Sequence, residues 1–168
     1  MNIYTAMKAL VAVQESVSIT LPQPVAVKKA YLSMPHQSQS MTLLPCWTNS
    51  WDFVREERHG ALRTMAYIVN MRLHVARVTA GSNDIAAEIA LAFLDPILTA
   101  FGSTNANLNG IGGVTLMGDV NGTVQSTVTH QNIRGGSPTL AVFGEGDART
   151  IGLDLICEME MSDAFSYS

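Results

Sequence analysis

Two segments of the chain alternate strictly between apolar and polar residues. Residues 69–75 place Val, Met, Leu and Val at odd positions, with Asn, Arg and His between them. Residues 151–161 also carry an apolar side chain at every odd position. A period of two residues is typical of a strand that packs one face against a core. We therefore predict one long strand within residues 61–77 and a last strand at 149–161.

Two further segments have the three- and four-residue spacing of amphipathic helices. In residues 3–18 an apolar stripe runs beside a polar face and weakens at Gln14. In residues 83–101 large apolar side chains recur every four residues, so this helix is apolar nearly all round. We expect one face of this helix to pack on a sheet and the opposite face to contact a neighbouring subunit. Pro96 should kink this second helix or split it into two pieces.

The segments around these elements contain residues that break regular structure. Pro22 and Pro24 end the first helix, and residues 25–32 form a short strand candidate. Residues 35–49 are expected to form an irregular connection that is anchored by a buried Trp47.

A β-hairpin is predicted at residues 108–130, because Asn121-Gly122 is the pair that a type I′ turn favours. Few of its side chains are large and apolar, so we expect it to leave the domain as an extended arm. Residues 131–148 contain four glycines and are expected to form a mobile loop.

The order of elements predicts an α+β fold. We expect an antiparallel-dominated sheet, with two helices packed on one face and an extended β-hairpin arm. The length of 168 residues suits a single domain, from which the hairpin and loop at 108–148 project.

The composition favours a part of an assembly. Hydrophobic residues make up 47% of the chain and charged residues only 14%. The chain therefore has few charged residues for a surface that is fully exposed to water. Nine methionines suit adaptable interfaces. The net charge of −4, with Lys8, Lys28 and Lys29 as the only lysines, argues against a nucleic-acid-binding surface. We also expect no membrane-spanning helix, no secretory signal, and reduced thiols at Cys46 and Cys157.

No residue pattern predicts catalysis, a cofactor or a bound metal, so we expect a protein that is not an enzyme. Glu56, His59 and His74 could form a metal site only if the fold brings them together, and an ion-paired turn at 56–59 is the simpler interpretation. The glycines at 109–113 precede strand-like residues instead of opening a helix, which favours the hairpin over a phosphate-binding loop.

Several features together resemble the tail terminator proteins of long-tailed bacteriophages, also called tail completion or head-to-tail joining proteins. They are the first helix, Leu44-Pro45-Cys46-Trp47, the segment from Arg55 to Gly60, the alternating strand, the capped second helix and the last strand. The resemblance implies a virion protein, assembled in the host cytoplasm, that forms a homohexameric ring. Such a ring sits on the tail tube, ends tail polymerisation, and contacts a head-side neck or connector protein. It acts through its shape, while DNA passes through without specific binding.

We expect the partner-facing residues of such a ring to come from the charged segment and the hairpin: Arg55, Glu56, Arg58, Asn121, Gly122, Gln125, His130 and Arg134. A second expectation concerns Asp154, Glu158 and Glu160, which could line a central opening and repel DNA phosphates. The alternatives are another neck or connector component or a tail tube subunit; a metal-dependent enzyme and a cellular binding module are more distant.

Overall fold

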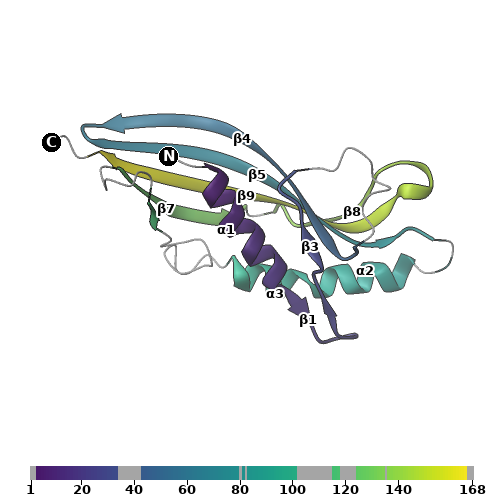
Figure 1. Cartoon of the computed structure of the whole chain (residues 1–168). Coiled ribbons are helices and arrows are strands. Elements are labelled where there is room, and N and C mark those ends of the chain that lie inside the picture. The colour runs from purple at the N-terminus through teal and green to yellow at the C-terminus, as the bar shows by residue number, and fades with distance from the viewer. Residues whose placement is uncertain are drawn as a thin grey trace.

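The centre of the protein is a pair of long antiparallel strands, β5 (Leu62–Arg77) and β9 (Thr150–Phe165). A computed structural model describes residues 3–33, 43–79, 81, 83–101, 115–117, 124–134 and 136–165 (Figure 1). Within this pair Met71 lies opposite Leu155 and Leu73 opposite Leu153, so the apolar odd positions of both strands share one face. Both strands predicted from the alternation are confirmed.

Other strands extend this pair on both sides into a mixed sheet. β4 (Cys46–His59) pairs with β5, and the short β3 (Lys29–Ala30) runs parallel to β4. On the far side, β7 (Val124–Ile133) and β8 (Thr139–Phe143) both pair with β9, and β6 (Thr115–Met117) pairs with β7. Apart from β3 with β4, every described pair is antiparallel, so the α+β class is confirmed for a sheet that is not wholly antiparallel.

The helices lie on one side of this sheet, as Figure 1 shows. α1 (Ile3–Ser16) lies under the β3–β4 side, and α2 (Asn83–Ala92) with α3 (Leu94–Ala100) lies under β9 and β8. The second predicted helix is therefore split, with a turn at Phe93 between its two pieces. This agrees with the effect expected from Pro96, which stands in the first turn of α3 where its missing amide proton does no harm.

One apolar core joins both groups of helices to the sheet. Leu10 of α1, Phe93 and Ile97 each have no exposed surface, and they pack with the odd positions of β5 and β9. The weak point of the α1 stripe, Gln14, is also fully buried. Its amide donates to Asn49 Oδ1 at 2.8 Å and accepts from Asn49 Nδ2 at 2.9 Å. This reciprocal pair satisfies two buried amides and fixes α1 to β4.

The short strand expected at 25–32 is present as two pieces, β2 (Val25–Ala26) and β3. β2 pairs with β1 (Ser18–Ile19), which follows α1 directly, in a separate small sheet. Of the described helices, none is both long and apolar enough to cross a membrane.

β4 is the main element that the sequence analysis missed. Residues 46–49 were expected in an irregular connection and 56–59 in an ion-paired turn, yet both belong to this strand. All ten of its residues from Ser50 to His59 are exposed, and those from Arg55 on are all polar, so no apolar face marks that end as a strand. A bulge between Phe53 and Arg55 also changes which positions share a face, and this interrupts the two-residue period.

The expectation for residues 108–148 was partly wrong. β6 and β7 do pair as a hairpin would, with Thr115 opposite Thr127, but the turn at Asn121-Gly122 lies outside the described residues. β7 runs along β9 from Val124 to Ile133, so this strand belongs to the sheet, and a projecting arm is not confirmed. Residues 131–148 are not one mobile loop, because β8 and a short 3-10 turn, Gly146–Ala148, lie within them.

Replacing Gly152 tests how closely β5 and β9 approach. A Cβ atom at this position would lie 1.6 Å from the Leu73 carbonyl oxygen, which is backbone and cannot move aside alone. We expect Gly152→Ala to lower the free energy of unfolding by about 3 kcal/mol, at the upper end of the cost of overpacking. Urea denaturation measures this. Gly146→Ala is the control, because only its positive φ of 57° opposes a side chain, at a cost of about 1 kcal/mol. Equal losses for both variants would contradict the close approach.

Candidate interaction surface

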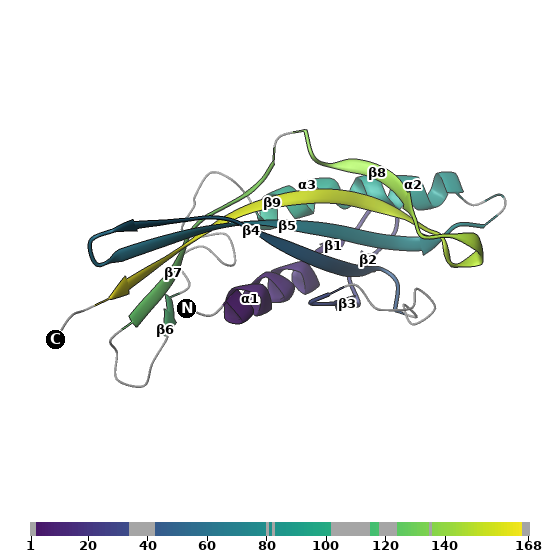
Figure 2. The same cartoon turned by 90° about the horizontal axis from the view of Figure 1, so that it is seen from above.

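The helices leave one face of the sheet uncovered, and Figure 2 looks onto this open face. It is formed by the even positions from 64 to 72 of β5 and from 154 to 162 of β9, which are only partly buried, and seven of these ten residues are polar. Because alternate residues of a strand point to opposite faces, burial of the odd positions under the helices forces the even positions outward. The open face is therefore the surface that this fold offers to a partner.

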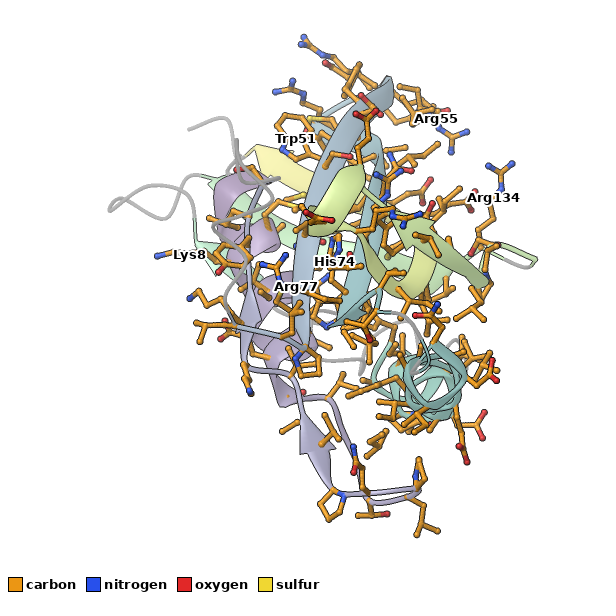
Figure 3. The ribbon with its side chains drawn as sticks, turned by 90° about the vertical axis from the view of Figure 1, so that its right-hand side faces the viewer. Lys8, Trp51, Arg55, His74, Arg77 and Arg134 are labelled. Atoms are coloured by element: carbon orange, nitrogen blue, oxygen red, sulfur yellow. The ribbon has the colours of Figure 1, made fainter. Side chains whose placement is uncertain are left out.

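Three ion pairs cross the open face, and each contains one of the acids of β9. Asp154 lies 3.3 Å from Arg72, Glu158 lies 3.7 Å from Arg134, and Glu160 lies 2.8 Å from Arg55. In Figure 3, Arg55 and Arg134 lie on the side of the sheet away from α2 and α3. The three acids singled out in the sequence thus share one face, and each of them has an arginine partner.

These ion pairs largely determine the charge of the open face, but they contribute little to the stability of the fold. Their side chains are 33–56% exposed, and pairs this accessible contribute about 0–1 kcal/mol each because water and salt screen them. Each arginine cancels the charge of one acid. The open face is accordingly close to neutral along β9, in contrast to the purely acidic wall expected from the sequence.

Two shallow hollows lie between the side chains of the open face. The first has a volume of about 400 Å³ and is lined by Val54, Arg55, Ala66, Tyr67, Ile68, Glu158, Met159 and Glu160. The second, of about 330 Å³, is lined by Thr48, Asn49, Ser50, Asn70, Arg72 and Asp154. Both contain one of the ion pairs, so a partner that entered them would meet a charge pair beside apolar or amide groups.

Beyond the bulge in β4, neighbouring charged residues point to opposite faces, as in any strand, and the bulge places Arg55 on the face of Ala66. Arg55 reaches Glu160 and, at 3.4 Å, Glu57. Glu56 belongs to a separate cluster, 2.6 Å from Arg58 and 3.0 Å from Arg63. Hydrogen bonds from these two arginines hold the pKa of Glu56 below its usual value. The structure thus brings Arg55 together with an acid of β9 and separates it from Glu56 and Arg58.

The remaining residues of the expected partner surface are only partly placed. Asn121 and Gly122 lie outside the described residues. Gln125 and His130 belong to β7, where their backbones lie opposite Ala164 and Glu160. Arg134 directly follows this strand and donates its amide proton to the Ile156 carbonyl oxygen.

Exposed apolar side chains gather on β4, and the sequence analysis did not single them out. Trp51 is 44% exposed and Phe53 is 52% exposed, and both meet the ring of Tyr67 edge-on at 5.8 and 5.7 Å. Among the described residues, the outer side of β4 pairs only with β3, at Cys46 and Trp47. The alternation of Trp47, Trp51 and Phe53 with polar residues was the available signal. These aromatic residues therefore lie beside an unpaired strand edge.

The opposite side of the sheet also ends in an open edge. In the part of the chain that the structure describes, β8 pairs with β9 alone. Its Leu140 and Val142 are 39% and 54% exposed. An open edge presents unpaired backbone amides and carbonyls, which another strand can bind. The sheet thus has two open edges, one on each side.

His74 is part of a buried polar cluster near the start of β4, where His74 lies opposite Cys46. Its Nε2 lies 2.9 Å from Thr48 Oγ1 and its Nδ1 2.7 Å from Thr150 Oγ1, so each hydroxyl can satisfy one ring nitrogen. The Phe143 ring packs against it at 5.0 Å, and the Arg72 guanidinium lies over that ring. Burial, with a smaller effect of the Arg72 charge, lowers the pKa of His74 to about 4. The imidazole is therefore neutral at physiological pH.

The metal site considered from the sequence is not assembled. His74 pairs with Cys46 at one end of β4 and β5, and His59 pairs with Leu62 at the other end. Twelve residues of extended strand separate His74 from Leu62, a distance of about 40 Å. The described residues contain no cluster of three or more His, Cys, Asp and Glu side chains that could hold a metal ion.

The two cysteines are buried and form no disulfide. Burial raises the pKa of the Cys46 thiol to about 11. Since the thiolate is the reactive form of cysteine, this side chain is a poor nucleophile at neutral pH.

Comparison with models of known protein families gives no match, and comparison with curated proteins gives none either. The interpretation of this surface therefore depends on its own geometry.

The buried histidine predicts a specific pH dependence of stability. In the unfolded chain His74 titrates near its ordinary value of 6.5, and in the folded protein near 4. Between these values the unfolded state binds the proton and the folded state does not, so stability falls as the pH falls. We expect a loss of about 3 kcal/mol from pH 7 to pH 4, about 1.4 kcal/mol per pH unit within the window.

Urea denaturation at a series of pH values measures this loss as the difference between wild type and His74→Gln. The variant keeps polar atoms in the cluster but cannot titrate. Parallel pH profiles of the two proteins would show that His74 is not the group responsible. His59→Gln is the matched control, because that side chain is exposed at the tip of the β4–β5 hairpin.

Proposed function

We propose that this chain is a structural virion protein of a long-tailed bacteriophage, whose copies form a ring on the end of the tail tube. The ring ends tail polymerisation and joins the tail to the neck of the head. The observation that carries the proposal is that, among the residues the structure describes, β4 and β8 leave open edges on opposite sides of one sheet. A subunit with two different binding sides can bind the next copy head to tail, and the same contact repeats between successive copies until a ring closes.

Two other observations support this proposal. The first helix, the alternating long strand, the split second helix and the last strand, on which the sequence resemblance is based, follow one another in the structure in the expected order. The exposed aromatic residues on β4 provide contact area beside an open edge, and aromatic side chains are enriched at protein interfaces.

Capping then follows from position alone. The far ends of β4, β5 and β9 reach beyond the helices in Figures 1 and 2. The charged side chains of Glu56, Arg58 and Arg63 lie at this end of β4 and β5, where a partner could contact them. A ring whose subunits place these ends against the last layer of the tube would remove the surface on which the next tube subunit docks. A tail tube subunit or another neck component with the same open edges is the second candidate.

Negative-stain images of the purified chain distinguish these candidates. A terminator should form closed rings with an open centre and stop there. When it is added to assembling tube subunits from its own virion, the rings should lie at tube ends and shorten the mean tube length. Long tubes formed by the chain alone would favour the tube-subunit alternative, and tubes of unchanged length would contradict capping.

A second experiment addresses the DNA channel. We propose that the open face lines the opening, where its paired charges neither attract nor strongly repel DNA. Changing Asp154, Glu158 and Glu160 to Lys leaves six positive groups there, which should hold DNA phosphates and slow ejection from virions. Ejection is followed by the fluorescence of a DNA-binding dye.

The matched control changes the partners Arg55, Arg72 and Arg134 to Gln, which leaves the acids uncovered. Ejection from these virions should stay as fast as from wild type, because uncovered acids repel DNA. If the lysine variant assembles into virions and ejects its DNA at the wild-type rate, the open face does not line the channel.

A further inference from the structure

Away from the open face and the tip of the β4–β5 hairpin, lysines and acids gather on different long sides of the molecule. All three lysines of the chain are on the side formed by α1, β3 and the first half of β4, from Cys46 to Phe53, which we call the basic side. Lys8 is on α1 and lies far from α2 and α3 in Figure 3. Lys28 and Lys29 are exposed at β3. Against its three lysines this side holds two acids, Glu15, which lies 3.5 Å from Lys29, and the exposed Asp52 on β4. The basic side therefore keeps a positive charge.

The opposite side carries a group of exposed acids. This acidic side consists of α2, α3, β8 and the loop at 144–149. It holds Asp84 and Glu88 on α2, Asp95 on α3, and Glu145 and Asp147 after β8. In the described part of the chain no basic side chain lies within ion-pair distance of these five acids. The neighbouring Arg149 donates to the Gly146 carbonyl oxygen instead. The acidic side is therefore negative overall.

Both sides also expose apolar side chains and an open strand edge. On the acidic side Ile85, Leu91 and Val142 are 60%, 53% and 54% exposed. On the basic side, Trp51 and Phe53 stand beside the open edge of β4. Figure 2 places α1 and β3 along one long side of the sheet and α2, α3 and β8 along the other. The two sides thus carry opposite charges, and each has exposed apolar side chains and an open strand edge. They face away from each other.

We propose that the acidic side of one copy of this chain docks on the basic side of the next copy. Opposite charges steer the two sides together and disfavour contacts between like sides, while the apolar side chains provide buried area. The contact is head-to-tail because its two halves are different surfaces, and a head-to-tail contact closes into a ring when its rotation allows. This inference deepens the proposed function and rests on it for the expectation of a closed ring, whereas the contact itself can be tested without a tail tube.

Charge reversal on each side provides the test. Lys28→Glu with Lys29→Glu makes the basic side negative, and Glu88→Lys with Glu145→Lys makes the acidic side positive. Each variant alone should associate at least about tenfold more weakly than wild type, because like charges then meet in every contact. Sedimentation velocity over a range of concentrations measures the association, and circular dichroism checks the fold. Lys28→Glu alone, which spares the bridge from Lys29 to Glu15, should act in the same direction.

Restoration is the sharper part of the experiment. In an equal mixture of the two variants, each reversed side meets a reversed side and each unchanged side meets an unchanged side. The mixture, and a single chain that carries all four changes, should associate like wild type. Arg58→Glu, an exposed charge at the tip of the β4–β5 hairpin and outside both sides, is the control and should leave association unchanged.

The outcomes separate this inference from the proposed function. Folded reversal variants that associate like wild type, a mixture that stays dissociated, or a wild-type chain that is monomeric at high micromolar concentration would each overturn the head-to-tail contact. If reversal and restoration behave as expected but the rings leave tail tubes unlimited in length, the contact stands and the capping function fails. If wild-type rings cap tubes and the reversal variants do so equally well, only the assignment of the two sides fails.

Discussion

The structure depends on a mismatch of length between its strands and its helices. β9 has 16 residues and would span about 53 Å, while the helical segment from Asn83 to Ala100 spans about 27 Å. The helices therefore cover one face of the sheet over part of its length, and the far ends of β4, β5 and β9 extend beyond them (Figures 1 and 2). A sheet that is covered on one side only needs polar residues on the other. This requirement accounts for the alternation in the sequence and for the charged open face.

Where polar groups do enter the interior, they are paired, and the pairs hold separate elements together. The amides of Gln14 and Asn49 bind each other and fix α1 to β4, and Asn49 also donates to the Tyr31 carbonyl oxygen at 2.7 Å. His74 connects β4, β5 and β9 through the hydroxyls of Thr48 and Thr150. An apolar core alone would tolerate a strand shifted by two residues, whereas these bonds form in one register only. These bonds hold the first residues of β4 in place, and β4 is the strand whose outer edge is open.

The sequence predicted those parts of the fold in which one face of an element is buried. β5, β9 and both helical segments followed from periodicity, including the break at Phe93 before Pro96. β4 did not, because its residues from Arg55 on are all polar and its bulge changes the period. The site was predictable to a similar extent. Asp154, Glu158 and Glu160 all occupy even positions of one strand, so the sequence placed them on one face. The pairing of Glu160 with Arg55, 105 residues away, depends on the strand order β4–β5–β9, which only the structure supplies.

The same bulge that concealed β4 also limits where another chain can bind it. A long open edge is a hazard, because any exposed strand can pair with it. Beyond Phe53 the register shifts and the chain continues as Arg55, Glu56, Glu57 and Arg58, so continued pairing there would need a matching bulge and matching charges. Before Phe53 the edge is regular and lies beside Trp51. Association through β4 is thus confined to the half nearer α1 and the lysines, where a second copy would meet apolar, backbone and charged groups at one place.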